Sequence, residues 1–141
     1  MIEWQKNPIA ALDNLKGALR RKILRKAITR GIRIFRGPLK SAVPVDKGKL
    51  RKGVATKVYT SRRKAVVGLI GARVSIAPHL HLVDRGTKDR KTKSGHRTGR
   101  VIGQHFMDHV YATHHTQAID TMRQVCAEEI HNELLKAGSK A

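Results

Sequence analysis

The chain has 141 residues, with 30 Lys and Arg against 10 Asp and Glu, which gives a formal net charge of +20 at pH 7. This length fits one domain with a modest hydrophobic core, and so large a positive charge needs an anionic partner or many neighbouring subunits. The single Cys126 excludes an internal disulfide and is expected to be a buried packing residue. No apolar run reaches the roughly 18 residues of a membrane span and the chain starts without an apolar leader, so we expect a protein made in a cytoplasm.

The charge is unevenly distributed along the chain. Residues 1–100 hold 27 basic and 5 acidic side chains, whereas residues 101–141 hold 3 basic and 5 acidic side chains. We therefore expect the last 41 residues to present a different kind of surface.

A long amphipathic helix is predicted over residues 8–36. Leu, Ile and Ala recur there at helical spacing, and Lys and Arg occupy the remaining face. Asn7 before Pro8 is a suitable N-cap followed by proline at the first helical position. Gly37 and Pro38 predict the end of this helix.

A turn is predicted after the helix. Pro44 fixes its own φ, Asp46 can accept hydrogen bonds from N–H groups that follow it, and Gly48 permits a positive φ. We interpret Pro44, Asp46 and Gly48 as a structural turn, after which the chain continues as a strand.

A small antiparallel sheet of three to four strands is predicted over residues 50–87. Residues 50–59 and 65–72 are rich in β-forming side chains and are separated by a polar turn, which is typical of a hairpin. The apolar run from Leu80 to Val83 predicts a further strand.

The last third of the chain contains a polar segment and a second long helix. Residues 88–100 offer almost nothing to bury, which predicts a flexible basic loop. Helical periodicity returns over residues 105–137, and Gly138 follows it. The predicted fold is a single α+β domain of residues 1–141, with the small sheet packed against the N-terminal and C-terminal helices.

No catalytic motif accompanies these elements. The serines lack a Gly-x-Ser-x-Gly elbow, and the spaced glycines 95, 99 and 103 lack the Lys-Ser/Thr of a phosphate-binding loop. His105 and His109 lie four residues apart on one helix face, yet no Glu or Cys stands at a metal-site spacing. We therefore expect no enzyme, no cofactor and no metal site, and a metal-dependent nuclease stays a third alternative that metal analysis of the purified protein would test.

The basic segment is the candidate binding site. Its cations are interpreted as contacts for DNA or an acidic protein partner, and the alternative interpretation is a solvated loop. Aromatic residues are not interleaved with the basic clusters, so any nucleic-acid contact is expected to be electrostatic and nonspecific. The candidate contact residues are Arg90, Lys91, Lys93, Arg97 and Arg100.

Three segments, in order along the chain, resemble the small head-to-tail joining or tail completion (minor tail component) family of long-tailed bacteriophages. Residues 42–51 resemble that family's Ala-Pro-x-x-Thr-Gly-x-Leu-Arg pattern, with Lys47 in place of Thr. Residues 79–87 resemble its apolar strand that ends in an acidic residue, one further residue and Gly-Thr, and residues 104–107 resemble the aromatic-led start of its last helix. The strand-end motif consists here of Asp84, Gly86 and Thr87.

The resemblance, which spans residues 10–137, implies a structural virion protein of the phage neck, with no catalytic residues. It would join the head connector to the tail and assemble as a homo-oligomeric ring around the DNA path. Its expected partners are copies of itself, neighbouring neck and tail proteins and, through nonspecific contact, packaged DNA, with no membrane. The expected location is the virion, after assembly in the bacterial host cytoplasm. The alternative, from the charge alone, is a small basic nonspecific nucleic-acid-binding protein.

Overall fold

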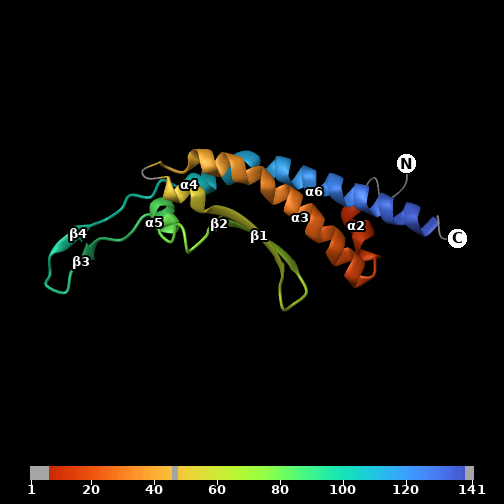
Figure 1. The fold of residues 1–141 in the computed structure, drawn as a ribbon, viewed down its shortest axis with the longest axis horizontal. Coiled ribbons are helices and arrows are strands. Elements are labelled where there is room, and N and C mark those ends of the chain that lie inside the picture. Colours follow the sequence, from red (N-terminus) through yellow and green to blue (C-terminus); the bar gives the residue numbers. More distant parts are fainter. Residues whose placement is uncertain (1–6, 46–47, 139–141) are drawn as a thin grey trace. The chain divides into compact units, whose positions relative to one another are not determined.

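The computed structural model describes residues 7–45 and 48–138 and has the α+β class predicted from the sequence, with a long helix near each end (Figure 1). The strands pair as β1 with β2 and β3 with β4, in two separate two-stranded sheets rather than one. The elements in chain order are α2 Pro8–Asp13, α3 Gly17–Ala42, α4 Lys49–Gly53, β1 Val54–Thr60, β2 Val66–Ala72, α5 Leu80–Arg85, β3 Arg90–Lys91, β4 Arg97–Gly99 and α6 Phe106–Gly138.

The chain forms two compact units. Unit 1 comprises Met1–Ile34, Thr56–Leu69 and His114–Ala141, and unit 2 comprises Phe35–Ala55 and Ile70–Thr113. The two long helices and the strands β1 and β2 each continue from one unit into the other, so that both units contain helix and strand.

The N-terminal helix begins as predicted but is divided in two. The Oδ1 of Asn7 accepts a hydrogen bond from the N–H of Ala10 at 3.2 Å, and Pro8 stands in the first turn of α2. An N–H in the first turn of a helix has no intrahelical acceptor, so the missing N–H of Pro8 costs no hydrogen bond there. The helix breaks after Asp13, and α3 begins at Gly17.

The prediction that Gly37 and Pro38 end the helix is wrong, because α3 continues through Pro38 to Ala42. Proline inside a helix removes one hydrogen bond and costs about 3 kcal/mol. The residues beyond it, Leu39 and Val43, are only 2% and 1% exposed. Burying two such side chains gains about 3 to 6 kcal/mol, which offsets the cost of the proline.

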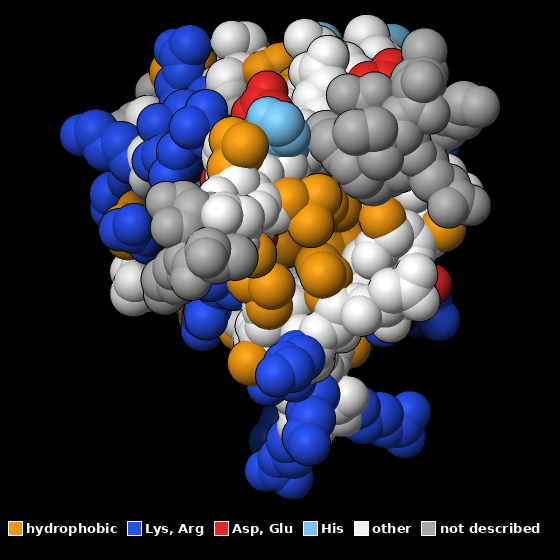
Figure 2. Space-filling view, turned by 90° about the vertical axis from the view of Figure 1, so that its right-hand side faces the viewer, with side chains coloured by type: hydrophobic (Ala, Val, Ile, Leu, Met, Phe, Trp, Pro, Cys, Tyr) orange, Lys and Arg blue, Asp and Glu red, His pale blue; other side chains and the backbone are white. Residues whose placement is uncertain are grey.

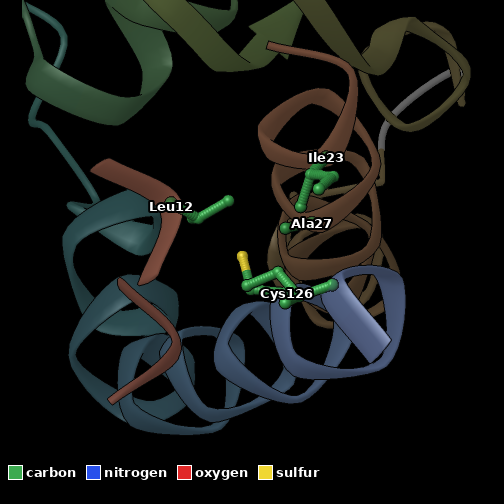
Figure 3. Packing of buried hydrophobic residues seen from close by; sticks show 5 residues of the cluster. Leu12, Ile23, Ala27 and Cys126 are labelled. Carbon is green, nitrogen blue, oxygen red and sulfur yellow. The ribbon is translucent and has the colours of Figure 1, made fainter. Parts of the chain in front are cut away.

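In unit 1, α2, α3 and α6 enclose a small hydrophobic core (Figure 3). Gly31 allows a close approach of α3 and α6, because a Cβ there would overlap the Met122 side chain and lie 3.1 Å from the Ala118 carbonyl oxygen. Cys126 is buried, which raises the pKa of its thiol and confirms its role as a packing residue. The core residues are Leu12, Ile23, Ala27, Cys126 and Ile130.

The hairpin of β1 and β2 is confirmed, but the strand predicted at Leu80 to Val83 is wrong. That run forms α5, in which Leu80 and Asp84 are the buried residues. Their spacing of four residues puts them on one face of a helix, and a short apolar run cannot be assigned to strand or helix by periodicity alone. The sheet predicted over residues 50–87 therefore reduces to the β1–β2 hairpin.

The predicted turn contains the positive φ that its glycine permits. Gly48 has a φ of 70° and precedes α4, in which Lys52 N–H donates to the Gly48 carbonyl at 3.0 Å. Pro44 is half-buried, and Asp46 lies outside the described residues. The strand expected from residue 50 begins only at Val54, because this short helix comes first.

Candidate functional site

The predicted basic loop, residues 88–100, contains a short hairpin that we call the basic arm. Strands β3 and β4 pair antiparallel, with Arg90 opposite Gly99 and Lys91 opposite Arg97. At its tip the N–H of Thr92 donates to the His96 carbonyl at 2.8 Å. Within unit 2 the basic arm extends away from α5 (Figure 1). These hydrogen bonds need no buried side chain, which explains why apolar patterning gave no strand here.

The five candidate contact residues all lie on the basic arm and are exposed. Arg97 forms an ion pair with Asp89 at 3.2 Å, with side chains 74% and 54% exposed, a type of pair that contributes at most about 1 kcal/mol. Among the described residues, the other four side chains make no hydrogen bond or ion pair. The arm therefore presents cations whose charge is not neutralised within the chain. These four are Arg90, Lys91, Lys93 and Arg100.

Asp84 holds the base of the arm to the start of α6. Asp84 is only 3% exposed, and its Oδ1 accepts a hydrogen bond from the N–H of Met107 at 2.9 Å. Its carbonyl oxygen also accepts from the N–H of His105 at 2.8 Å. A carboxylate at a helix N-terminus satisfies a free N–H and interacts favourably with the helix dipole. Asp84 thus acts as an N-cap donated by another helix, and its predicted place at a strand end is corrected to the last turn of α5.

Next to Asp84 two backbone segments cross without room for side chains. Gly86 has a φ of 79°, and a Cβ there would lie 2.7 Å from both the Gly103 nitrogen and the Val101 oxygen. A Cβ on Gly103 would lie 2.5 Å from the Arg85 carbonyl carbon. Thr87 N–H donates to the Val101 oxygen at 2.9 Å, and Val101 N–H donates to Thr87 Oγ1 at 2.9 Å. Sequence reasoning missed Gly103 because its contact partner lies far away along the chain.

An open cleft of about 620 Å³ lies at the base of the arm, lined by residues 85–89 and 100–103. Arg85, Lys88 and Arg100 contribute positive charge, and Asp89 contributes one carboxylate. Ile102, on the same lining, is 76% exposed. The arrangement suits an anionic partner that also covers apolar surface.

A second basic surface lies in unit 1, where α3 and α6 line a groove of about 530 Å³ that we call the α3 groove. In the sequence its cations have the pattern of the polar face of an amphipathic helix. Their recurrence at intervals of three and four residues is the signal that identifies a continuous charged face. The lining residues are Lys22, Arg25, Lys26, Thr29, Arg30, Arg33, Val125, Glu128 and Glu129.

The histidines do not assemble into a metal site within the described part of the chain. Nowhere in residues 7–45 and 48–138 do three His, Cys, Asp or Glu side chains group as metal ligands. His105 instead stands at the start of α6 with a φ of 50°, and its Nδ1 lies 3.7 Å from Asp108 Oδ2. In the same part of the chain, none of the helices is long and apolar enough to cross a membrane.

No protein-family model, curated protein sequence or solved structure matches the chain. A functional proposal therefore depends on the geometry of the two units and on the three motifs in the sequence.

Proposed function

We propose that the chain is a structural virion protein of a bacteriophage neck, which joins the head connector to the tail and assembles as a ring around the DNA path. The observation that carries the proposal is the contact between the second and third motifs in unit 2. Asp84 binds the backbone of His105 and Met107. The residues singled out by the resemblance thus serve the architecture of one fold, as expected of a structural protein with no reaction to perform.

Exposed apolar side chains support self-assembly. In unit 2, Val74, Ile102 and Val45 are 78%, 76% and 62% exposed. In unit 1, Leu134 and Leu135 are also exposed, and Figure 2 shows apolar side chains gathered in the middle of one face. Apolar side chains that gather on one face, as in Figure 2, are a common mark of a protein–protein contact.

The two-stranded sheets also support assembly. Within the described residues, β1 pairs only with β2, so each has one edge without a strand partner. Exposed edges are a liability in a monomer, and neighbouring subunits in a ring cover them. The exposed cations of the basic arm would then meet packaged DNA or acidic neighbours, which dilutes the +20 charge.

The deciding experiment is the molar mass from light scattering on a sizing column, after nuclease treatment, at moderate and at high salt. A discrete multimer under both conditions supports the proposal. The second measurement is joining of tails to filled heads in an extract that lacks this protein. A monomer that also fails to restore joining overturns the neck assignment.

The alternative function is a small nonspecific nucleic-acid-binding protein, favoured by the unneutralised cations of the basic arm. It predicts that affinity falls steeply with salt, because each phosphate contact releases counterions. Charge reversal at Arg90, Lys91, Lys93 and Arg97 should then reduce the salt dependence of binding. Weak binding that is indifferent to these changes argues against this alternative.

A further inference from the structure

We propose that the α3 groove of unit 1 binds the phosphodiester backbone of duplex nucleic acid. This site is separate from the basic arm, which belongs to unit 2. The proposal does not depend on the neck assignment, because it concerns a binding surface that can be measured on the purified protein in any assembly state.

The cations of the α3 groove form one row. Positions 22, 25, 26, 30 and 33 are separated by three or four residues, or by one, so that they share a face of α3. At 1.5 Å per residue the row extends about 16 Å along the helix axis. All five side chains are exposed, and the helix that carries them is fixed by the buried residues Ile23 and Ala27. A rigid row of cations follows an extended polyanion at low entropic cost.

The row has a neutralised end and an open end. Lys26 Nζ lies 2.6 Å from Glu129 Oε2, and Lys22 Nζ lies 3.6 Å from Glu133 Oε1. Toward the other end, the side chains of Arg30 and Arg33 make no hydrogen bond or ion pair with any described residue. We therefore expect an anion from outside the chain to bind most strongly at the open end of the row.

Within the neutralised end, between Lys22 and Lys26, Arg25 is held in place without losing its charge. Its Nη2 donates to the Val58 carbonyl of β1 at 3.3 Å, which fixes the guanidinium but supplies no carboxylate. A guanidinium has five donors, so that several stay available for an oxyanion. Arg25 thus adds a third arginine without a carboxylate partner to the lining of the groove.

The chemistry of the lining favours phosphate over an acidic protein. Protein partners recognise apolar and aromatic anchors at the centre of an interface, and among the described residues that line this groove only Val125 is an aliphatic hydrophobic side chain. Nucleic-acid interfaces are polar and positive, and the lining of this groove has five Lys and Arg side chains against Glu128 and Glu129. The unpaired cations are arginines, whose planar forks bind two phosphate oxygens at once.

The same lining favours duplex over single-stranded nucleic acid. Binding of single strands depends on aromatic side chains on which unpaired bases stack. No aromatic residue lines the α3 groove among the described residues. What this surface can contact is the backbone of a paired duplex, without readout of sequence.

The test is fluorescence anisotropy with a labelled DNA duplex of arbitrary sequence, titrated with the full chain over a range of salt. We expect the variant Arg30→Gln/Arg33→Gln to lose at least about tenfold in affinity near 0.1 M salt, and the slope of log K against log salt to fall by about two. The matched variant Lys22→Gln/Lys26→Gln removes the same charge from the neutralised end and should lose much less. Arg30→Lys/Arg33→Lys should keep the salt slope.

The unfolding midpoint, competition by other anions and the molar mass serve as controls for the loss of affinity. Arg30 and Arg33 are exposed, so the thermal unfolding midpoint of the Gln variant should match that of the unmodified chain. An affinity and a salt slope that do not change in this variant overturn the proposal. Competition by polyglutamate as strong as by duplex at equal charge identifies an acidic protein instead, and preference for a single strand also overturns the duplex assignment. The molar mass of the variant separates this site from the neck proposal, since altered assembly would place the two arginines at a subunit contact.

Discussion

The helix α6 is held in two different ways along its length. At its start, in unit 2, it is held by the Asp84 carboxylate and by a crossing of backbone segments at Gly86 and Gly103. Further along, in unit 1, it is held by burial of Cys126 and Ile130 and by ion pairs to α3. The first region is specified by backbone geometry and the second by side-chain packing. We therefore expect the first to tolerate almost no change and the second to adapt.

The largest expected effect is that of Gly103→Ala. A new Cβ would lie 2.5 Å from the Arg85 carbonyl carbon and 2.8 Å from the Asp84 oxygen, and backbone atoms cannot move aside as a flexible side chain can. We expect a loss of about 3 kcal/mol in the free energy of unfolding, at the upper end of ordinary point substitutions. Urea unfolding followed by circular dichroism measures it.

The matched control for Gly103 is Gly37→Ala. Gly37 lies on α3, and a Cβ there would have no atom within 4 Å outside its own surroundings. Alanine in a helix is favoured over glycine by roughly 0.5 to 1 kcal/mol, but Pro38 disfavours helical backbone for a preceding residue that has a Cβ. These opposing effects should leave the stability of this variant within about 1 kcal/mol of that of the unmodified chain. Equal losses for the two variants would mean that the crossing at Gly103 is not a tight backbone contact.

The next largest effect is expected at Asp84, whose carboxylate caps the N-terminus of α6. Asp84→Ala leaves the N–H of Met107 without its acceptor in a part-buried position, which should cost about 2 kcal/mol. Asp84→Asn keeps an acceptor oxygen and should recover part of this loss. If Asn and Ala are equally destabilising in urea unfolding, the hydrogen bond to Met107 is not what holds the start of α6.

The sequence was informative where the signal is local. The periodicity of residues 105–137 predicts α6, observed at Phe106–Gly138, and the Asn7-Pro8 pair predicts the start of α2. The short run at Leu80 is ambiguous because strand and helix patterns coincide over four residues. The helix α3 continues through Pro38 because residues that follow it are buried. A rule based on the neighbouring sequence alone does not contain that burial.

Only part of the candidate site could be predicted from the sequence, for the same reason. The cations of residues 88–100 were found because charge is visible in the sequence, but the hairpin that carries them was not, because its hydrogen bonds are between backbone groups. The cap from Asp84 to Met107 joins residues on two different helices, so that neither neighbourhood predicts it. The α3 groove was missed because a row of cations on a helix is also what an ordinary solvated face looks like.

A smaller effect is expected where side chains can adapt. In Gly31→Ala the new Cβ would overlap the Met122 side chain, whose flexible thioether can move, although the Ala118 oxygen stays 3.1 Å away. We expect a loss of about 1 to 2 kcal/mol in the free energy of unfolding. The double variant with Met122→Ala should lose less than the sum of the two single variants. Strict additivity in this double-mutant cycle would mean that the two residues do not share the space between α3 and α6.

The smallest effect concerns the ion pairs of unit 1 and their pH dependence. The pKa of Glu133 is lowered by a hydrogen bond from Lys136 Nζ at 3.1 Å and by the charges of Lys136 and Lys22. A lowered carboxyl pKa contributes stability above its value in the unfolded chain, about 4.3, and this contribution is lost as the pH falls through the folded pKa. Glu133→Gln should therefore be slightly less stable than the unmodified chain at neutral pH, and the stabilities of the two proteins should converge in acid.

The matched variant is Glu128→Gln, because Glu128 is exposed and its side chain has no hydrogen bond or ion pair among the described residues. Thermal unfolding across pH should show a larger pH-dependent gap for Glu133→Gln than for Glu128→Gln, and a Glu133 gap that persists in acid would assign its effect to packing rather than to charge.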